Sequence, residues 1–445
     1  MAQTLCTTYH FSNADSAAPL VARLAGRMAA DGADTAKTDA AVCAILENVE
    51  KNGLDAVLAY TRAFDCPTFT EAMFAVDAKD IEKAACSVSD EDRAIIRTAA
   101  TRIRTFHEAQ KERNWFMTDE SGCILGQVVM PVDRAGLYVP GGQGGETPLI
   151  SSLLMNAVPA QVAGVSGIAV VSPPRKDGSI SPYILAAAHE LGITEVYACG
   201  SAWAAAALAF GAGPLKPVDL IAGPGNIWVT TAKRLLQGKV GIDMLAGPSE
   251  ICIVADETAN PAWLAADMLS QAEHDPLASS VLVTSDAALA ARVSGELAVQ
   301  TPQLPRSNVA HQSLADWGAI VVTPDIATAV AIANKLAPEH LELSVADPWA
   351  LLPSIRHAGA IFMGHHSAES AGDYFAGPNH VLPTMGTARF SSALSVQTFC
   401  KKSSVLSVNE SFTRAHASSI ARLARLEGLE AHAKAMEARV QRKPE

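Results

Sequence analysis

The sequence predicts an α/β protein with two Rossmann-like parallel-sheet units, a helical N-terminal part and an extended C-terminal tail. From Val128 onward, short apolar runs that end in turn residues alternate with alanine-rich helical segments. Such alternation is typical of parallel sheets that carry helices on both faces. The runs are too many for one small sheet, so we expect two units. The length of 445 residues and the hydrophobic content of 49% allow two or three domains with a sizeable core.

Residues from about 16 to 115 are predicted to be helical. The segment TDAAVCAILENVEKNGLDAVLAYTRAF has apolar residues at spacings of three and four, interrupted by Gly53. This period is that of amphipathic helices, and glycine is a common break between them. We therefore expect a helical layer in this part of the chain.

Seven apolar runs are predicted to be strands. They are GIAVVSPP, EVYACG, VDLIAGPGN, EICIVADE, SVLVTSD, GAIVVTPD and GAIFMG. We assign residues 1–137 and 241–381 to a first α/β domain, which includes the helical N-terminal part, and residues 138–240 to a second. Residues 382–445 contain SSVLSVNES and a helical end, and we expect this long, loosely attached tail to pack on a neighbouring subunit.

Composition and charge favour a small-molecule ligand. The formal net charge of −12 opposes binding to nucleic acid, which needs clustered Lys and Arg. The first twenty residues lack a basic start and an apolar run, and we expect a cytoplasmic protein without a membrane anchor. The eight cysteines form no C-x-x-C pair, which indicates reduced, mostly buried thiols.

Gln271 and His274 end the predicted helix WLAADMLSQAEH. They lie one turn apart on a shared face, whereas Leu264, Met268 and Leu269 face a core. A polar pair of this kind indicates a ligand. The alternative is a histidine that interacts only with the helix dipole.

Glu339 and His340 in LAPEHLEL form a second candidate pair, before a predicted strand. Glutamate and histidine suit proton transfer, because one can act as base while the other activates water. The alternative is two solvated side chains at a helix terminus.

Two further clusters contain His with an acid. Asp373 and His380 lie in AESAGDYFAGPNHVLPT, where a carboxylate beside imidazole fits Zn or Mn, although an Asx turn explains Asp373 equally well. Glu427 and His432 lie in EGLEAH, which by itself is typical of a solvated helix face.

Three glycine-rich turns, YVPGGQGGETP, AGPGN and AGPSE, could offer backbone N–H groups to phosphate. A nucleotide site is one interpretation and tight turns are the other. No G-x-G-x-x-G with an acidic partner about twenty residues later decides between them.

Taken in order, these segments resemble the histidinol dehydrogenase family from about residue 30 to the end. The motifs that carry the resemblance are GLYVPGG, LIAGPGN, DMLAGPSE, ADMLSQAEH, LAPEHLEL, GDYFAGPNHVLPT and EGLEAH. The resemblance implies an NAD-linked oxidoreductase of histidine biosynthesis that contains one Zn²⁺ per subunit. It would oxidise L-histidinol to L-histidine through L-histidinal, a four-electron reaction that reduces two NAD.

The resemblance also implies roles for individual residues. The zinc ligands would be Gln271, His274, Asp373 and His432, with His432 supplied by the partner chain of an intertwined homodimer. We expect two substrate nitrogens to complete the zinc coordination, so that the metal mainly orients the substrate. His340 would act as base in both hydride transfers and Glu339 would activate water. Ser249 and Glu427 would contact the substrate, as would His340 and the four zinc ligands.

The NAD side of the site is implied to lie in residues 138–240, where Tyr138 and Asn226 match NAD contacts of the family. Two features depart from the family pattern. Trp203, in GSAWAAAALAFG, stands where the family usually has a glutamine near NAD, and the loop QGGETPLISS differs from the family's usual wording. Both departures concern the cofactor side only.

Three rival functions are also compatible with the sequence. A related dehydrogenase acts on sulfopropanediol, but Glu339 and Glu427 favour histidinol. A zinc hydrolase could use Glu339 with the same ligands, and its turnover would not depend on NAD. A non-catalytic binding protein would bind zinc without oxidising an alcohol.

Overall fold

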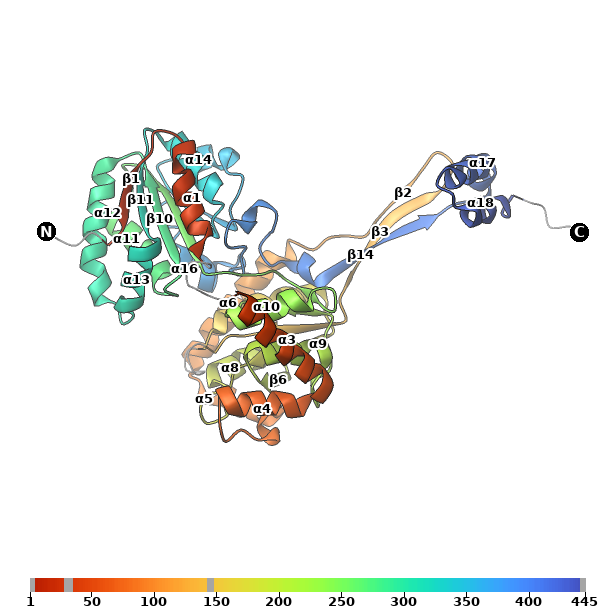
Figure 1. The fold of residues 1–445 in the computed structure, drawn as a ribbon, viewed down its shortest axis with the longest axis horizontal. Helices are drawn as coiled ribbons and strands as arrows, with labels where there is room; N and C mark the ends of the chain where they lie inside the picture. Colours follow the sequence, from red (N-terminus) through yellow and green to blue (C-terminus); the bar gives the residue numbers. More distant parts are fainter. Residues whose placement is uncertain (1–4, 28–34, 142–147, 441–445) are drawn as a thin grey trace, which may run out of the picture. The chain divides into compact units, whose positions relative to one another are not determined.

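The computed structural model describes residues 5–27, 35–141 and 148–440. The chain divides into two compact units (Figure 1). The first contains residues 1–110 and 132–399, and the second contains residues 111–131 and 400–445. The first unit holds two parallel sheets flanked by helices, which confirms the predicted α/β class.

The larger sheet has six parallel strands in the order β1-β11-β10-β9-β12-β13. The central strands are buried along their whole length, as expected for a sheet covered on both faces. The strands are β1 (Thr7–His10), β9 (Glu250–Ala255), β10 (Ser279–Thr284), β11 (Ala319–Val322), β12 (His340–Ser344) and β13 (Ala360–Met363).

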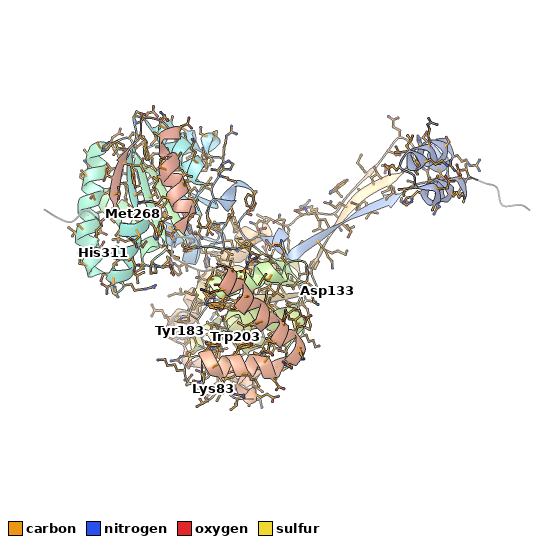
Figure 2. All side chains as sticks on the ribbon, viewed as in Figure 1. Lys83, Asp133, Tyr183, Trp203, Met268 and His311 are labelled. Carbon is orange, nitrogen blue, oxygen red and sulfur yellow. The ribbon has the colours of Figure 1, made fainter. Side chains whose placement is uncertain are left out.

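Helices cover both faces of this sheet. One apolar core contains residues of α11 (Pro261–Ala272), α12 (Ala287–Gln300) and α13 (Ser307–Trp317), including Met268 (Figure 2). The other contains residues of α1 (Ala18–Ala25) and α14 (Ile326–Leu336). Short helices α15 (Pro348–Leu351) and α16 (Glu369–Ala371) and a π-helical turn (Gly372–Ala376) complete this part.

The smaller sheet has five parallel strands in the order β6-β5-β4-β7-β8. They are β4 (Arg134–Tyr138), β5 (Gly167–Ser172), β6 (Glu195–Ala198), β7 (Leu220–Ala222) and β8 (Gly241–Ile242). The helices between them are α7 (Ile150–Ala163), α8 (Pro182–Glu190), α9 (Ser201–Phe210) and α10 (Ile227–Leu236).

The helical N-terminal part packs on helices of the five-stranded sheet. Its helices are α3 (Thr35–Asn52), α4 (Leu54–Phe64), α5 (Ala78–Ser87) and α6 (Asp90–Glu108). α3 and α4 contact α9, α5 contacts α8, and α6 contacts α7 and α8. This packing differs from the predicted grouping of residues 1–137 with the larger sheet, because periodicity shows which helix face is buried but not which sheet covers it.

The second unit is a three-stranded antiparallel sheet followed by two helices. The strands are β2 (Trp115–Thr118), β3 (Ile124–Pro131) and β14 (Cys400–Ser407), in the order β14-β3-β2, and the helices are α17 (Glu410–Leu426) and α18 (Glu430–Glu437). The predicted helical end is divided at Gly428, whose φ of 76° lies in the left-handed region that glycine tolerates. Within the described ranges of the whole chain, no helix combines the length and apolar character that crossing a membrane requires.

Candidate active site

Gln271 and His274 lie at the C-terminal end of α11, as predicted. The Gln271 side chain is 1% exposed, and its Oε1 has no hydrogen-bond partner among the described residues. His274 follows the helix and is accessible to solvent. Because a buried amide oxygen without a partner costs about 1–3 kcal/mol, this atom is suited to accept a ligand.

Strand β12 brings a second set of polar groups to the site. Its sequence HLELS alternates, so that His340 and Glu342 share one face and Leu341 and Leu343 share the other. The two leucines belong to the apolar core next to α1 and α14. His340 and Glu342 are also buried, and buried polar side chains on a strand need partners or a function.

The two ring nitrogens of His340 have different environments. Nδ1 lies 3.0 Å from the backbone oxygen of Glu250, the first residue of the neighbouring strand β9. Since a carbonyl oxygen only accepts, the proton of a neutral His340 ring is on Nδ1. Nε2 has no hydrogen-bond partner among the described residues and lies 3.5 Å from Asp373 Oδ1. In the neutral ring, Nε2 is therefore the nitrogen that can accept a proton from a substrate.

Carboxyl groups surround the His340 ring. Oxygens of Glu339 and Glu369 each lie 3.6 Å from His340 Nδ1. Burial raises the pKa of Glu339 to about 8 and that of Glu369 to about 7. Burial lowers the pKa of His340, but Glu369, Glu339 and Asp373 outweigh it and raise that pKa well above its ordinary value. Acids and a base with shifted pKa values in one place are typical of a proton-transfer site.

Glu250 supports Glu339 from strand β9. Glu339 Oε2 accepts a hydrogen bond of 2.8 Å from the backbone N–H of Glu250. The Glu250 carboxylate in turn accepts one of 2.5 Å from the buried guanidinium of Arg27 and one of 3.1 Å from Met385 N. Glu250 Oε2 also accepts from Glu339 N at 3.3 Å, so the two residues hold each other at the amino ends of adjacent strands.

His274, Glu369 and Asp373 form a group with metal-ligand spacing. One ligand atom from each lies within 4.8 Å of the others. Asp373 is in the π-helical turn, a feature that often occurs at functional sites. Glu369 is fixed by Ser270, which donates to Glu369 Oε2 at 3.2 Å, and by Glu342, which accepts from Glu369 N at 2.9 Å.

Glu369 and Glu250 were not among the predicted site residues. Glu369 lies four residues before Asp373, a spacing that places two side chains on one face of a helix. This spacing in AESAGDY could have identified Glu369. Nothing in the sequence marks Glu250, whose part depends on its position beside Glu339 in the sheet.

Ser249 and His380 are two further candidate residues of the first unit. Ser249 immediately precedes β9, and its carbonyl accepts from Ser279 N at 3.0 Å. His380 Nε2 has no hydrogen-bond partner among the described residues. Burial lowers the pKa of His380, against the opposing effect of Asp373, and this lower pKa favours a neutral ring.

Glu427 and His432 lie in the second unit. Glu427 caps the C-terminal end of α17, His432 is on α18, and both are exposed. The four predicted zinc ligands are thus divided between the units, with three in the first and His432 in the second.

The predicted NAD residues lie on the five-stranded sheet. Tyr138 ends β4 and is buried, and its hydroxyl oxygen accepts from Ser201 N at 3.2 Å. Asn226 follows β7 and caps α10, accepting from Trp228 N and Val229 N. Both are at carboxyl ends of parallel strands, where ligands of open α/β sheets bind. Of the loop QGGETPLISS, residues 143–147 lie outside the described residues.

Trp203 on α9 is a packing residue (Figure 2). It is 5% exposed and stacks on Tyr60 and Phe64 of α4, with ring centroids 5.7 and 5.6 Å apart. This stacking explains the tryptophan by packing alone, so no contact with a cofactor is needed to account for it. A contact of Trp203 with NAD stays a prediction.

Comparisons with known proteins find relatives along almost the whole chain. The family model described as histidinol dehydrogenase matches residues 28–440. A histidinol dehydrogenase of Nitratidesulfovibrio vulgaris is 62% identical over 416 residues, which cover 94% of each chain. One of Oleidesulfovibrio alaskensis is 62% identical over 396 residues, covering 89% of this chain and 91% of the relative. The crystal structure of histidinol dehydrogenase from Elizabethkingia anophelis has a TM-score of 0.91 at 34% identity and covers 99% of both chains.

Proposed function

Because this chain belongs to the histidinol dehydrogenase family of oxidoreductases, we propose that it oxidises L-histidinol to L-histidine through L-histidinal, with NAD as oxidant and one Zn²⁺ per subunit. The observation that carries the proposal is the free Nε2 of the buried His340, 3.5 Å from Asp373 and supported by Glu339 and Glu369. This is a general base beside a group with metal-ligand spacing.

The donor set fits zinc. Gln271, His274 and Asp373 would hold the ion, and His432 would be the fourth protein ligand. Imidazole and carboxylate are common zinc donors, and the unpartnered Oε1 of Gln271 is an acceptor that a cation would satisfy. Zinc would supply orientation and polarisation of the substrate hydroxyl. Ser249 and Glu427 would add substrate contacts.

His340 performs the proton transfers in this proposal. Nε2 accepts the hydroxyl proton as hydride passes to NAD, and the Glu250 carbonyl keeps the Nδ1 proton in place. The carboxylates near Nδ1 stabilise the imidazolium that forms. Glu339 then activates the water that hydrates L-histidinal, for which a pKa of about 8 is close to the neutral optimum. His340 acts again as base when the hydrate is oxidised to the carboxylate.

NAD would bind at the carboxyl ends of the five-stranded sheet. Tyr138 and Asn226 lie there at the ends of β4 and β7, and AGPGN leads into the N-terminus of α10. The N-terminus of a helix favours the pyrophosphate because it combines free N–H groups with a positive dipole end.

We also propose a homodimer in which the second unit contributes to the partner's site. Trp115, Phe116 and Met117 of β2 are 50%, 56% and 53% exposed, and Leu423 and Leu426 of α17 are 61% and 73% exposed. So much apolar surface on a small sheet and helix pair indicates a surface that is covered in the assembled protein. We propose that a second copy of the chain covers this surface. Such a dimer would also bring His432 of one chain to Gln271, His274 and Asp373 of the other. We also propose a cytoplasmic location for this biosynthetic enzyme.

The substrate is tested by comparing NADH formation from L-histidinol and from sulfopropanediol by the zinc-loaded protein. We expect L-histidinol to be oxidised with a kcat/KM at least about 100-fold higher, because Glu339 and the zinc ligands select an imidazole and an amine. Faster oxidation of sulfopropanediol would refute the substrate assignment. Turnover of an ester or amide without NAD would favour a hydrolase instead.

A further inference from the structure

Lys233 and Asp243 form a buried ion pair next to the five-stranded sheet. Lys233 is on α10 and Asp243 follows β8 directly. The pair joins Lys233 Nζ to Asp243 Oδ1, and the two side chains are 3% and 0% exposed. Removing each charge from water costs several kcal/mol of free energy. The attraction between the two charges offsets that cost only when further hydrogen bonds satisfy both groups.

Those further hydrogen bonds go to one glycine of the AGPGN turn. Lys233 Nζ donates to the Gly223 carbonyl at 3.0 Å, and Asp243 Oδ2 accepts from Gly223 N–H at 2.8 Å. Gly223 has a φ of 116°, and a Cβ there would lie 2.1 Å from the carbonyl oxygen of Tyr138. The ion pair therefore clamps the turn at its point of closest approach to the end of β4.

Asp243 and Thr230 hold the segment that follows β8. Asp243 Oδ1 accepts from Met244 N at 2.6 Å. The Thr230 hydroxyl on α10 lies 3.2 Å from the Ala246 carbonyl and 3.4 Å from the Gly225 carbonyl. This segment continues to Ser249, so the pair stands where the proposed NAD turn and the proposed substrate segment meet.

We propose that the Lys233–Asp243 pair positions the AGPGN turn for NAD binding, an inference that rests on the proposed NAD-linked function. Replacing a buried ion pair with apolar side chains of similar size is often neutral for stability, so stability alone does not require charges here. Holding both the N–H and the C=O of Gly223 requires a donor and an acceptor at fixed places. Lys233 and Asp243 are positioning residues and touch no reacting atom.

A matched control pair exists at the other end of the same sheet. Arg134 and Glu195, at the amino ends of β4 and β6, form two hydrogen bonds of 3.1 and 2.8 Å. They are 22% and 35% exposed and hold no turn at the carboxyl edge. Loss of this pair should affect stability without affecting the cofactor.

The test is the double variant Lys233→Met/Asp243→Leu, compared with wild type and with Arg134→Met/Glu195→Gln as full-length, zinc-loaded proteins. Thermal unfolding, zinc content, the Kd of NAD by equilibrium dialysis, and KM for NAD and for L-histidinol are measured. We expect the Kd and KM for NAD to rise at least about tenfold in the first variant, because a small displacement of a binding loop has effects of this size. Zinc content should stay within about twofold in both variants, and KM for L-histidinol should rise less than KM for NAD in the first variant, because the pair bonds directly to the AGPGN turn and reaches Ser249 only through the segment after β8. In the control, both KM values should stay within about twofold, since distant sites act independently.

A folded double variant that binds NAD as tightly as wild type would overturn the proposal. If that variant does not fold, Asp243→Asn removes the charge from the pair with little change of shape. It should raise the Kd and KM for NAD about threefold or more, because an amide has one acceptor oxygen and cannot both accept from Gly223 N–H and pair with Lys233, and unchanged values would overturn the proposal. Failure of wild type to bind NAD would instead contradict the proposed function.

Discussion

At the scale of single residues, the site depends on two atoms that lack hydrogen-bond partners among the described residues. Gln271 Oε1 and His340 Nε2 are both buried. Buried polar atoms usually have hydrogen-bond partners, and these two belong to residues at or beside the group with metal-ligand spacing, so both are suited to interact with a ligand. In the proposed function the first accepts zinc and the second accepts the substrate proton.

The role of His340 is tested by His340→Asn, which keeps an amide N–H near the position of Nδ1 and removes Nε2. We expect kcat to fall by about 10²- to 10⁴-fold, the usual contribution of a general base. Zinc content by atomic emission and the melting temperature should remain close to those of wild type. A variant that retained most of its kcat would exclude His340 as the base.

Gln271→Met tests the role of the amide oxygen with little change in side-chain volume. Zinc should raise the melting temperature of wild type, since a ligand bound only to the folded state stabilises it, and should raise that of the variant much less. Without metal the variant should be at least as stable as wild type, because an unsatisfied buried oxygen has been removed. Equal zinc-dependent shifts in both proteins would show that Gln271 is not a ligand.

At the scale of elements, most of the fold could be predicted from local pattern. All seven predicted apolar runs form strands, and the helix bearing Gln271 forms as α11. Strand β1 was not predicted, because TTYH is short and is identified as a strand only by its pairing with β11. The site residue Glu250 could not be assigned for a related reason, since its contact with Glu339 arises from the packing of separate elements.

The end of helix α4 gives a pH prediction that does not involve the metal. Asp65 follows α4, its Oδ2 is buried without a partner among the described residues, and burial raises its pKa to about 6. The folded state therefore keeps a proton that the unfolded chain loses near pH 4. The stability that this proton supplies is present below about pH 4 and is lost as the pH rises through about 6.

Asp65→Asn should remove that pH dependence. At pH 7.5 we expect the variant to be more stable than wild type by on the order of 1 kcal/mol, a value reduced for partial exposure of the carboxyl group. At pH 4 the two proteins should have similar stability. Urea unfolding at both pH values provides the measurement, and a variant less stable than wild type at pH 7.5 would contradict the assignment.

At the scale of the whole molecule, the division of the proposed zinc ligands between the two units leads to the proposed dimer. Gln271, His274 and Asp373 belong to the first unit and His432 to the second. If each site takes His432 from the partner chain, a mixed dimer of His432→Ala and His274→Ala chains contains one site with all four ligands intact. We expect the mixture to recover activity that neither variant has alone, up to about half of wild type per dimer formed. No recovery after subunit exchange, verified by mass spectrometry, would argue that the sites are not shared.

The most direct test of the central claim is the ratio of NADH formed to L-histidine formed from L-histidinol, after chelation and again after zinc is restored. We predict about two NADH per histidine with zinc and almost no turnover without it, because four electrons leave the substrate and each NAD accepts two. One NADH per substrate with release of the aldehyde, or turnover that does not depend on the metal, would contradict the proposed function.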